Sequence, residues 1–521
     1  MKFVMEAKSE TSAGSGNSTR PPRLMYLDDL LEGIPGIELS GPGDPQIASV
    51  ECDSRKVSAR TLFFALPGVK ADGLQFVPDA LARGAVAIAS VQPKPATIGA
   101  DITWITIPQG AERRALAIAS ANFFGRPTAA LKLVGITGTN GKTTTTFLVD
   151  SIVRAASFTS GLIGTTGYRT PQGNREALNT TPESLELQRM FAEVRDAGGT
   201  HVVLEASSHA LAMDRLWGCH FAAAVFTNLT RDHLDYHKNF EDYFAAKRRL
   251  FEGTGAGAPD TAVLNGDDPY EPRLEGLAKR TLTYGLKGNP DLTTKKFAPS
   301  FHGLEFTAQT PAGKIEVRSP LVGRINVYNI LAAIGAGLAL EIPAGKIEAG
   351  IANLDLVPGR FQRVDEGQPF LVVVDYAHTD DALKNLITSA RELNPEGRII
   401  TVFGAGGERD RTKRPLMGEA AGSLSDLVVL TSDNPRGEDP LRIINDVIVG
   451  LQKVNAKYRM EPDREPAIEI ALEEARPGDM VLLAGKGHET YQVLKDRTID
   501  FDDREKAREI LRRKGYAKKP R

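Results

Sequence analysis

The sequence is poor in several features that define other classes of protein. Only two of its 521 residues are cysteines, Cys52 and Cys219, which argues against a disulfide framework and fits a reducing cytoplasm. No segment approaches the ~20 consecutive apolar residues of a membrane span, so we expect no membrane insertion. The 64 basic and 66 acidic residues nearly cancel, which leaves no electrostatic basis for binding nucleic acid. We therefore expect a soluble, cytoplasmic protein.

The N-terminal segment and the chain length indicate how the chain is divided. No apolar core of about 7–15 residues follows Met1, so we expect no signal peptide. Residues 6–23 are polar and rich in Gly and Ser, and we predict a disordered tail over residues 1–23. The remaining chain is too long for one hydrophobic core, and three domains are expected.

A glycine-rich turn between a strand and a helix is the most informative segment. The apolar stretch Leu131–Ile136 enters this turn, and a helical pattern follows from Thr143 to Ala155. Glycine lets backbone N–H groups approach phosphate oxygens, and the start of a helix adds a favourable dipole. Lys142 would bring positive charge to the phosphates and Thr143 a hydroxyl to Mg²⁺. A turn without a ligand is the alternative, but the context favours an ATPase.

The glycine spacing of this turn departs from the strict P-loop pattern. That pattern would place glycine at position 136, where this chain has Ile136. Ordinary P-loop kinases and GTPases therefore fit the sequence poorly, although an ATP-binding role still fits.

Strand-like and helical segments alternate along most of the chain, which predicts an α/β protein with parallel sheets and right-handed crossovers. We place a small α/β domain at 24–111, a central ATPase domain with a P-loop-type parallel sheet at 112–358, and a Rossmann-like domain at 359–521. Residues 298–322 alternate apolar and polar side chains, which predicts an antiparallel addition to the central domain. The segment 357–360 resembles a hinge.

Polar clusters follow six of the predicted strands. Loops are polar in general, so one such cluster would carry little weight. Six clusters in the same position relative to their strands are informative, because open α/β sheets bind ligands outside the carboxyl ends of their strands. We expect an active site where the polar ends of two sheets face each other. The clusters are Glu205–His209, Asn228–His233, Asp375–His378, Gly404–Arg409, Asp433–Arg436 and Gly485–Glu489.

Lys247 lies on the apolar face of a predicted helix over residues 240–251. On this spacing alone, the side chain would extend along the apolar surface and place its amine in water. The alternative is a buried amine with a lowered pKa, which is partly neutral and nucleophilic. A neutral amine can capture CO₂ as a carbamate, and the carbamate is an anionic metal ligand. Periodicity does not choose between these two interpretations.

Taken together, the motifs resemble the Mur ligases, which are ATP-dependent amide-forming enzymes of peptidoglycan synthesis. The resemblance extends in order over residues 24–515. It rests on Thr137–Thr144, Glu205–His209, Thr227–Asp235, the Ala-Lys-Arg around Lys247, and Asp375–His378. Within the family, Asp433–Arg436 and Gly485–Glu489 resemble the branch that adds meso-diaminopimelate to UDP-N-acetylmuramoyl-L-alanyl-D-glutamate.

The resemblance implies a nucleotide site and a metal site. The implied cofactors are ATP, two Mg²⁺ ions and a CO₂-derived carbamate on Lys247. The implied ATP contacts are Gly138, Thr139, Asn140, Gly141, Lys142, Thr143, Thr144, Asn329 and Arg360. The implied metal positions are Thr143, Glu205, His233 and Lys247. The implied catalytic residues are Lys142, Glu205, His233, Lys247 and His378.

The resemblance also implies two substrate sites. Ser54 would contact uridine, and Thr180, Thr181, Ser207 and Arg215 would contact the muramoyl-peptide. Met213 stands where many family members have glutamine, so one substrate contact is in doubt. The implied diaminopimelate contacts are Arg409, Asp433, Asn434, Pro435, Arg436, Gly485 and Glu489.

The implied reaction proceeds through an acyl phosphate. The D-glutamate γ-carboxylate attacks the ATP γ-phosphate, and the diaminopimelate amine then displaces phosphate. His378 and Asp375 are candidates for accepting the amine proton. Arg436 would grip the second carboxylate, which lysine lacks.

Other interpretations remain open. They are a folylpolyglutamate synthase-like ligase, a lysine-adding Mur ligase and a non-catalytic ATP-dependent scaffold. We expect a monomer, and the sequence does not distinguish meso- from LL-diaminopimelate.

Overall fold

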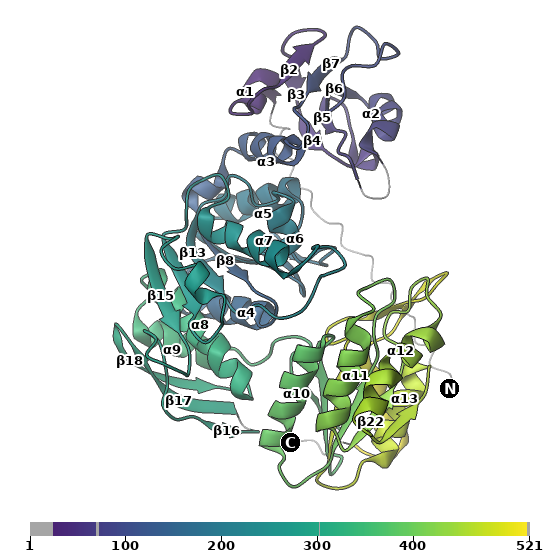
Figure 1. Cartoon of the computed structure of the whole chain (residues 1–521). Helices are drawn as coiled ribbons and strands as arrows, with labels where there is room; N and C mark the ends of the chain where they lie inside the picture. Colours follow the sequence, from purple (N-terminus) through teal and green to yellow (C-terminus); the bar gives the residue numbers. More distant parts are fainter. Residues whose placement is uncertain (1–23, 69–71, 302, 518–521) are drawn as a thin grey trace, which may run out of the picture. The chain divides into compact units, whose positions relative to one another are not determined.

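The computed structural model describes residues 24–68, 72–301 and 303–517, so the tail predicted at 1–23 lies outside the described residues. Backbone contacts divide the chain into two compact units, Met1–Phe123 and Phe124–Arg521 (Figure 1). Among the described helices, none is both long and apolar enough to cross a membrane.

The first unit is built on a five-stranded sheet in the order β2-β7-β6-β5-β4. All neighbouring strands are parallel except the edge pair β2 and β7. Helix α2 covers one face through a cluster that includes Phe63, Ala80 and Trp104. The elements of this unit are β1 Met25–Tyr26, α1 Leu27–Leu31, β2 Glu38–Ser40, β3 Gln46–Ile47, β4 Ser49–Glu51, η1 Ser54–Lys56, β5 Thr61–Phe64, η2 Gly73–Phe76, α2 Val77–Ala82, β6 Ala85–Ser90, β7 Thr103–Thr106 and α3 Glu112–Phe123.

Helix α3 belongs to this first unit. It packs against α1 and β4, and Asn122 Nδ2 donates hydrogen bonds to the backbone oxygens of Leu30 (3.1 Å) and Glu32 (2.9 Å). These contacts place α3 with the first unit, which ends at Phe123, whereas the predicted division after residue 111 places it with the central domain. The difference has a simple cause, because an amphipathic helix does not specify from its sequence which of two sheets it will cover.

The second unit begins with an eight-stranded sheet in the order β11-β10-β9-β12-β8-β13-β14-β15. Strands β9 to β15 in that order are parallel, and β10 and β11 form an antiparallel hairpin at the edge. The strands of this sheet are β8 Lys132–Thr137, β9 Ser160–Gly164, β10 Gly167–Thr170, β11 Gly173–Arg175, β12 His201–Glu205, β13 Phe221–Phe226, β14 Thr261–Asn265 and β15 Arg280–Tyr284.

Helices cover both faces of this sheet. On β8, Val134 and Ile136 join the core under α4, α8 and α9, whereas Leu133 joins the core on the other face. This burial on both faces explains why the strand is a nearly continuous apolar run. The helices are η3 Pro127–Ala130, α4 Lys142–Ala155, α5 Ser184–Asp196, α6 Ser208–Ala212, α7 Phe240–Glu252, η4 Glu271–Arg273, α8 Arg324–Ala339 and α9 Ala344–Ala352.

The antiparallel addition predicted over residues 298–322 is confirmed. Strands β16 Ala298–Ser300, β17 Gly303–Thr310 and β18 Gly313–Ser319 form a three-stranded antiparallel sheet. On β17, Leu304, Phe306 and Ala308 are buried, and the side chain of Glu305 between them is exposed. This alternation is the period-2 pattern that indicated the sheet.

The last part of the chain is a doubly wound sheet in the order β19-β20-β24-β21-β22-β23. Only the β19–β20 pair is antiparallel. Helices α10, α11 and α12 lie side by side on one face (Figure 1), and α13 and α14 cover the other. The elements are β19 Gln362–Val364, β20 Leu371–Asp375, α10 Asp380–Leu393, β21 Ile399–Phe403, α11 Lys413–Leu424, β22 Leu427–Leu430, α12 Pro440–Lys453, β23 Tyr458–Met460, α13 Arg464–Glu474, β24 Met480–Ala484, β25 Tyr491–Val493, β26 Thr498–Asp500 and α14 Asp503–Arg513.

Candidate active site

The predicted phosphate loop, residues 138–143, runs from the end of β8 into the start of α4 and has the close backbone packing that glycine permits. Gly138 and Gly141 have φ angles of 143° and 86°. A Cβ atom at position 138 would lie 1.9 Å from Thr227 Oγ1, so only glycine fits there. The end of β13 supports the loop, because Thr227 Oγ1 donates to the Asn140 oxygen (2.6 Å) and Asn228 Oδ1 accepts from the Asn140 nitrogen (2.9 Å).

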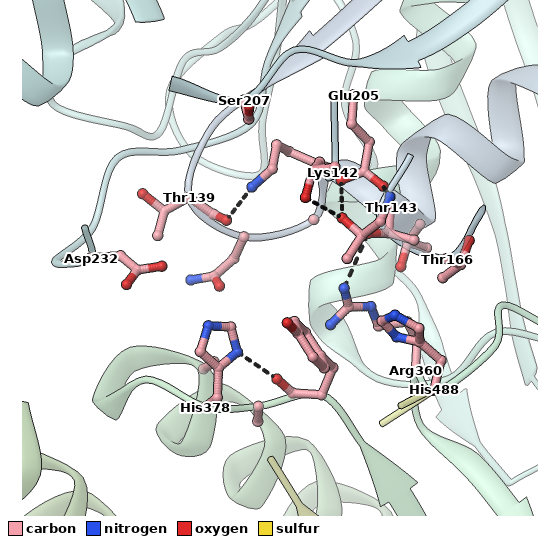
Figure 2. A pocket seen from close by; sticks show the side chains of 18 of the residues that line it. Thr139, Lys142, Thr143, Thr166, Glu205, Ser207, Asp232, Arg360, His378 and His488 are labelled. Atoms are coloured by element: carbon pink, nitrogen blue, oxygen red, sulfur yellow. Dashed lines mark hydrogen bonds between the residues drawn. The ribbon is translucent and has the colours of Figure 1, made fainter. Parts of the chain in front are cut away.

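Lys142 begins helix α4 and folds back over the phosphate loop. Its Nζ donates to the backbone oxygens of Gly138 (3.0 Å) and Thr139 (2.8 Å), as Figure 2 shows for Thr139. Burial lowers the pKa of Lys142, and the carboxylates of Glu205 and Asp232 partly oppose this effect. Its hydrogen-bond acceptors within the described residues are neutral carbonyl groups, so an anion placed at the loop would gain a strong partner.

Glu205 ends strand β12 and is held by a residue that sequence reasoning missed. Its Oε1 accepts from the Thr165 backbone nitrogen (2.9 Å) and its Oε2 from Thr165 Oγ1 (3.0 Å). Thr165 directly follows β9, in the segment Gly164–Gly167, which has the same position after a strand as the predicted polar clusters, although this strand itself was not predicted. That position was the available signal.

Lys247 on α7 is buried, with 1% of its surface exposed, so the interpretation in which it reaches water is wrong. Its Nζ donates to the Gly138 oxygen (2.7 Å) and lies 4.3 Å from the centre of the Tyr243 ring. Burial, followed by the charge of Lys142, lowers the pKa of Lys247 well below its ordinary value. The amine is therefore much more readily neutral than a surface lysine.

His233 and Asp232 lie beside these lysines in the loop after β13. His233 has a φ angle of 54°, and its Nε2 lies 3.3 Å from Asp232 Oδ2. Burial lowers the pKa of His233 to about 3, although Asp232 acts in the opposite direction. The imidazole is thus neutral near pH 7, as a metal-binding histidine must be.

The predicted metal ligands fit Mg²⁺ only in part. Among the described residues, no three His, Cys, Asp or Glu side chains converge as a metal-binding group. The Thr143 hydroxyl and the Glu205 carboxylate are oxygen donors of the kind that Mg²⁺ prefers, and both line one cavity. The Lys247 amine would repel a cation when protonated and could contribute an oxygen only as a carbamate.

The last sheet reaches the phosphate loop through two contacts. Arg360 Nη2 donates to Thr143 Oγ1 (3.0 Å; Figure 2), and the same guanidinium lies 4.6 Å from the centre of the Tyr376 ring. Asn140 Nδ2 donates to Asp381 Oδ2 (2.7 Å) near the start of α10. Asp381 was missed, since an acidic residue in the first turn of a helix is common for electrostatic reasons alone.

His378 and Asp375 follow β20 and have different environments. His378 Nδ1 lies 2.9 Å from the Tyr376 carbonyl oxygen (Figure 2), which places the proton on Nδ1 and leaves Nε2 as an acceptor. Burial lowers the pKa of His378, so the ring is neutral near pH 7. Asp375 accepts from the backbone nitrogens of Phe361 (2.7 Å) and Ala377 (2.9 Å), and its carboxylate therefore holds the segment after the predicted hinge.

The predicted muramoyl-peptide residues form a connected group at the ends of β9 and β12. Thr181 Oγ1 donates to the Glu205 oxygen (2.6 Å) and to Ser207 Oγ (3.1 Å). Arg215 Nη1 donates to the Thr181 oxygen (2.7 Å), and its Nη2 lies 3.5 Å from Met213 Sδ. The residue that departs from the family pattern thus contacts the arginine of this group directly.

A cavity of about 880 Å³ unites most of the predicted residues. The predicted residues that line it are Thr139, Asn140, Gly141, Lys142, Thr143, Thr144, Thr180, Thr181, Glu205, Ser207, Arg215, His233, Lys247, Asn329, Arg360, Asp375, His378, Arg409, Arg436 and Glu489. Gly138 does not line the cavity, and its carbonyl oxygen accepts from Lys247 Nζ. Ser54 is buried in η1 of the first unit.

A second cavity of about 200 Å³ shares part of this lining and contains six of the seven predicted diaminopimelate residues. Pro435 is the exception. Arg436 has a φ angle of 52°, and its Nη1 donates to the Gly407 oxygen (2.8 Å). Within the described chain, protein acceptors reach only Nη1 of this guanidinium. The six lining residues are Arg409, Asp433, Asn434, Arg436, Gly485 and Glu489.

Two buried cations beneath this second cavity were missed. Lys486 contacts Asn434 and Glu489, and Arg464 forms a fully buried ion pair with Asp503 (Nη2–Oδ2 2.6 Å). Arg464 Nη2 also donates to the Ala484 oxygen (3.0 Å), directly before Gly485. Lys486 lay inside a recognised polar cluster, whereas Arg464 had no distinguishing sequence pattern.

A glycine-rich phosphate loop at one parallel sheet, with a cavity completed by a second parallel sheet, defines a nucleotide-binding α/β enzyme. The chain belongs to the Mur ligase family. It matches the family's catalytic domain over residues 46–122, the Mur ligase middle domain over 136–337, and the Mur ligase glutamate ligase domain over 359–487. The first match ends at residue 122, within α3.

Curated relatives match nearly the whole chain. The UDP-N-acetylmuramoyl-L-alanyl-D-glutamate–2,6-diaminopimelate ligase of Solibacter usitatus is 55% identical, with 94% of this chain and 99% of the relative covered. The ligase of the same name from Geobacillus thermodenitrificans is 45% identical over the same shares of the two chains.

Solved structures of a Mur ligase and of another ligase share the fold. A structure of a UDP-N-acetylmuramoyl-L-alanyl-D-glutamate–2,6-diaminopimelate ligase is 33% identical with a TM-score of 0.63, covering 90% of this chain and 96% of that one. The Mycobacterium tuberculosis folylpolyglutamate synthase complexed with ADP and AMPPCP is 17% identical with a TM-score of 0.57, covering 71% of this chain and 91% of that one. The second likeness concerns the fold alone.

Proposed function

We propose that this chain is an ATP-dependent, ADP-forming ligase of peptidoglycan precursor synthesis. It joins meso-2,6-diaminopimelate to the D-glutamate γ-carboxylate of UDP-N-acetylmuramoyl-L-alanyl-D-glutamate, and it acts as a cytoplasmic monomer. The observation that carries the proposal is the continuity of the two cavities. His378, Arg436 and Glu489 line both, so an amino acid in the smaller cavity would be next to the contents of the larger one.

The phosphate loop and Lys142 would bind the ATP phosphates, with Asn329 and Arg360 as further nucleotide contacts. Two Mg²⁺ ions would be held by Thr143, Glu205, His233 and a carbamate on Lys247. The bound ions would offset the negative charge that develops during phosphoryl transfer. A neutral Lys247 amine in a buried position is the state from which a carbamate forms, and the lowered pKa of Lys247 supports this role.

The first step would activate a carboxylate. The D-glutamate γ-carboxylate is a poor acyl donor, so its oxygen attacks the ATP γ-phosphorus, ADP leaves and an acyl phosphate forms. Thr180, Thr181, Ser207 and Arg215 would hold the muramoyl-peptide next to the phosphate loop, with Ser54 of the first unit contacting uridine. Lys142 would stabilise the charge on the transferring group.

The second step would form the amide bond. The amine of diaminopimelate attacks the acyl carbon, and phosphate leaves from the tetrahedral intermediate. His378 is the better candidate for taking the amine proton, because its Nε2 faces away from the hydrogen bond that holds Nδ1. Asp375 accepts two backbone hydrogen bonds and is better suited to holding the hinge segment.

Arg436 would select diaminopimelate. Its Nη1 is anchored on Gly407, which leaves Nε and Nη2 for a two-pronged pair with a carboxylate. Asp433 and Glu489 would meet an ammonium group at the opposite side of the cavity. Lysine has no carboxylate at this position, so it would leave the guanidinium poorly paired, and this favours the diaminopimelate branch over the lysine-adding one. A folylpolyglutamate synthase-like role would leave the first unit without a UDP group to bind.

The proposal is tested by ADP release with UDP-N-acetylmuramoyl-L-alanyl-D-glutamate, ATP and Mg²⁺, and with meso-diaminopimelate or L-lysine as acceptor. We expect turnover with diaminopimelate and little with lysine. Equal turnover with lysine would contradict the specificity. No ADP release with either acceptor would contradict the ligase role and favour a scaffold or another substrate.

The Arg436→Ala variant should lose selectivity for diaminopimelate. We expect kcat/KM for diaminopimelate to fall about 100-fold, because one partner of a charge-assisted, partly buried pair is removed. Activity with lysine should change little. The matched control is Arg442→Ala, at an exposed position on α12. An unchanged ratio of kcat/KM for the two acceptors would assign selectivity to another residue.

A further inference from the structure

Lys486 lies fully buried beneath the smaller cavity, with 0% of its side chain exposed. Its Nζ lies 3.2 Å from Asn434 Oδ1, 3.3 Å from Glu489 Oε2 and 3.6 Å from Asp433 Oδ1. These three partners line the cavity, whereas Lys486 does not. The Lys486 ammonium therefore contacts these three side chains from the protein interior, on the side away from the cavity.

The same three partners are also connected to each other and to the following strand. Asn434 Nδ2 donates to Glu489 Oε2 (3.0 Å), and Asn434 Oδ1 accepts from the Val493 nitrogen (3.0 Å). The Asp433 backbone oxygen accepts from Gln492 Nε2 (2.7 Å). Lys486 is the cation of this network, and burying an ammonium is costly unless anions and hydrogen-bond acceptors surround it.

One acceptor in the network remains open. Asp433 Oδ1 is buried and has no hydrogen-bond partner among the described residues, and Lys486 Nζ at 3.6 Å is within ion-pair but not hydrogen-bond distance. A buried carboxylate oxygen without a donor is costly to maintain. Asp433 Oδ1 is therefore available to accept a hydrogen bond from an N–H group of a ligand in the cavity.

We propose that Lys486 is a positioning residue for the acceptor amino acid, and that it holds Asp433, Asn434 and Glu489 as a preorganised anionic surface for the substrate ammonium group. This inference rests on the proposed function and deepens it. The two carboxylates would otherwise repel each other across a small cavity, and the fixed cation between them removes that repulsion before the substrate arrives.

The charges around Glu489 lead to a pH-dependent consequence. Burial and the neighbouring Asp433 raise the pKa of Glu489, whereas Lys486 and the hydrogen bond from Asn434 lower it. In the described part of the chain, Tyr376, Tyr491 and Arg464 also interact electrostatically with Glu489. Without Lys486, Glu489 would stay protonated to a higher pH, and binding of an ammonium group would weaken on the acidic side.

The test is steady-state kinetics of the full-length Lys486→Met enzyme with each substrate varied in turn. We expect KM for meso-diaminopimelate to rise about 30-fold, because buried carboxylates lose their cation. KM for ATP and for the UDP-linked dipeptide should stay within about twofold of wild type. The acidic limb of kcat/KM for diaminopimelate should move to higher pH, and Lys486→Arg should recover part of both effects. Lys495→Met, at an exposed position between β25 and β26, is the matched control.

Each outcome has a distinct meaning. An unchanged KM and an unchanged acidic limb in Lys486→Met would overturn the positioning role and leave the proposed function intact. A wild-type enzyme that does not use diaminopimelate would overturn the proposed function and this role with it. If Lys486→Met does not fold, Lys486→Gln keeps a donor without the charge. A uniform rise in all three KM values in that variant would show a purely structural role and overturn the proposal.

Discussion

Replacement of Lys142 by methionine is expected to lower kcat for ADP formation about 1000-fold. Removing a preorganised group that stabilises charge in the transition state lowers the rate by roughly 10²–10³-fold. Methionine fills similar space but carries no charge. Among the described residues, Lys142 Nζ donates to backbone oxygens of its own loop and forms no ion pair with another side chain, so the substitution breaks none there. Single-turnover measurements at saturating ATP would separate this loss of rate from weaker nucleotide binding.

Lys132 provides the matched control for this prediction. It is exposed at the opposite end of the same strand, β8, so Lys132→Met removes a charge of the same kind away from the phosphate loop. We expect its kcat to equal that of wild type. If Lys142→Met retained kcat within about tenfold of wild type, the charge of Lys142 would not stabilise phosphoryl transfer.

Replacement of Lys247 by arginine should have an effect of similar size. Arginine stays positively charged and cannot form a carbamate, so the site would keep a cation where the proposed function requires an anionic metal ligand. We expect kcat to fall about 1000-fold, the loss expected when a metal site that stabilises transition-state charge is disrupted. The control is Arg248→Lys on the same helix, whose side chain forms a surface pair with Glu252 (3.0 Å).

Dissolved CO₂ should distinguish a carbamate from a structural role for Lys247. In CO₂-depleted buffer the wild-type enzyme should lose activity and regain it on addition of bicarbonate, whereas Lys247→Arg should not respond. Recovery of activity should depend on pH. The Lys247 amine is neutral above its lowered pKa and protonated below it, so recovery after addition of bicarbonate should slow as the pH falls. Activity that is independent of CO₂ in wild type would contradict the carbamate.

Buried strands of the parallel sheets could be predicted closely from the sequence. The polar clusters that begin at Glu205 and Gly485 were expected at the ends of strands, and β12 His201–Glu205 and β24 Met480–Ala484 end there. Both strands are buried on two faces, so an unbroken apolar run between polar ends specifies them. The phosphate loop was similarly predictable, because its glycines, lysine and threonine are adjacent in the chain.

Assignments that depend on contacts between distant segments were less predictable. The amphipathic pattern of α3 indicates a helix but not its partner, and the contacts of Asn122 with Leu30 and Glu32 assign it to the first unit. The periodicity around Lys247 left open whether its amine reaches water or is buried. Its burial follows from packing against the phosphate loop, about one hundred residues away in sequence, as the bond to Gly138 across 109 positions shows.

By itself, the sequence determined the α/β class, the order of strands and helices, the phosphate loop and the polar clusters at the strand ends. These are local properties, which depend on backbone preference and on the burial of neighbouring side chains. Only the tertiary structure decided which clusters share a cavity, that Arg360 and Asp381 reach the phosphate loop, and that Lys486 lies beneath Asp433 and Glu489. Those contacts join segments far apart in the chain, and their free energy depends on burial and charge that exist only after the sheets have formed.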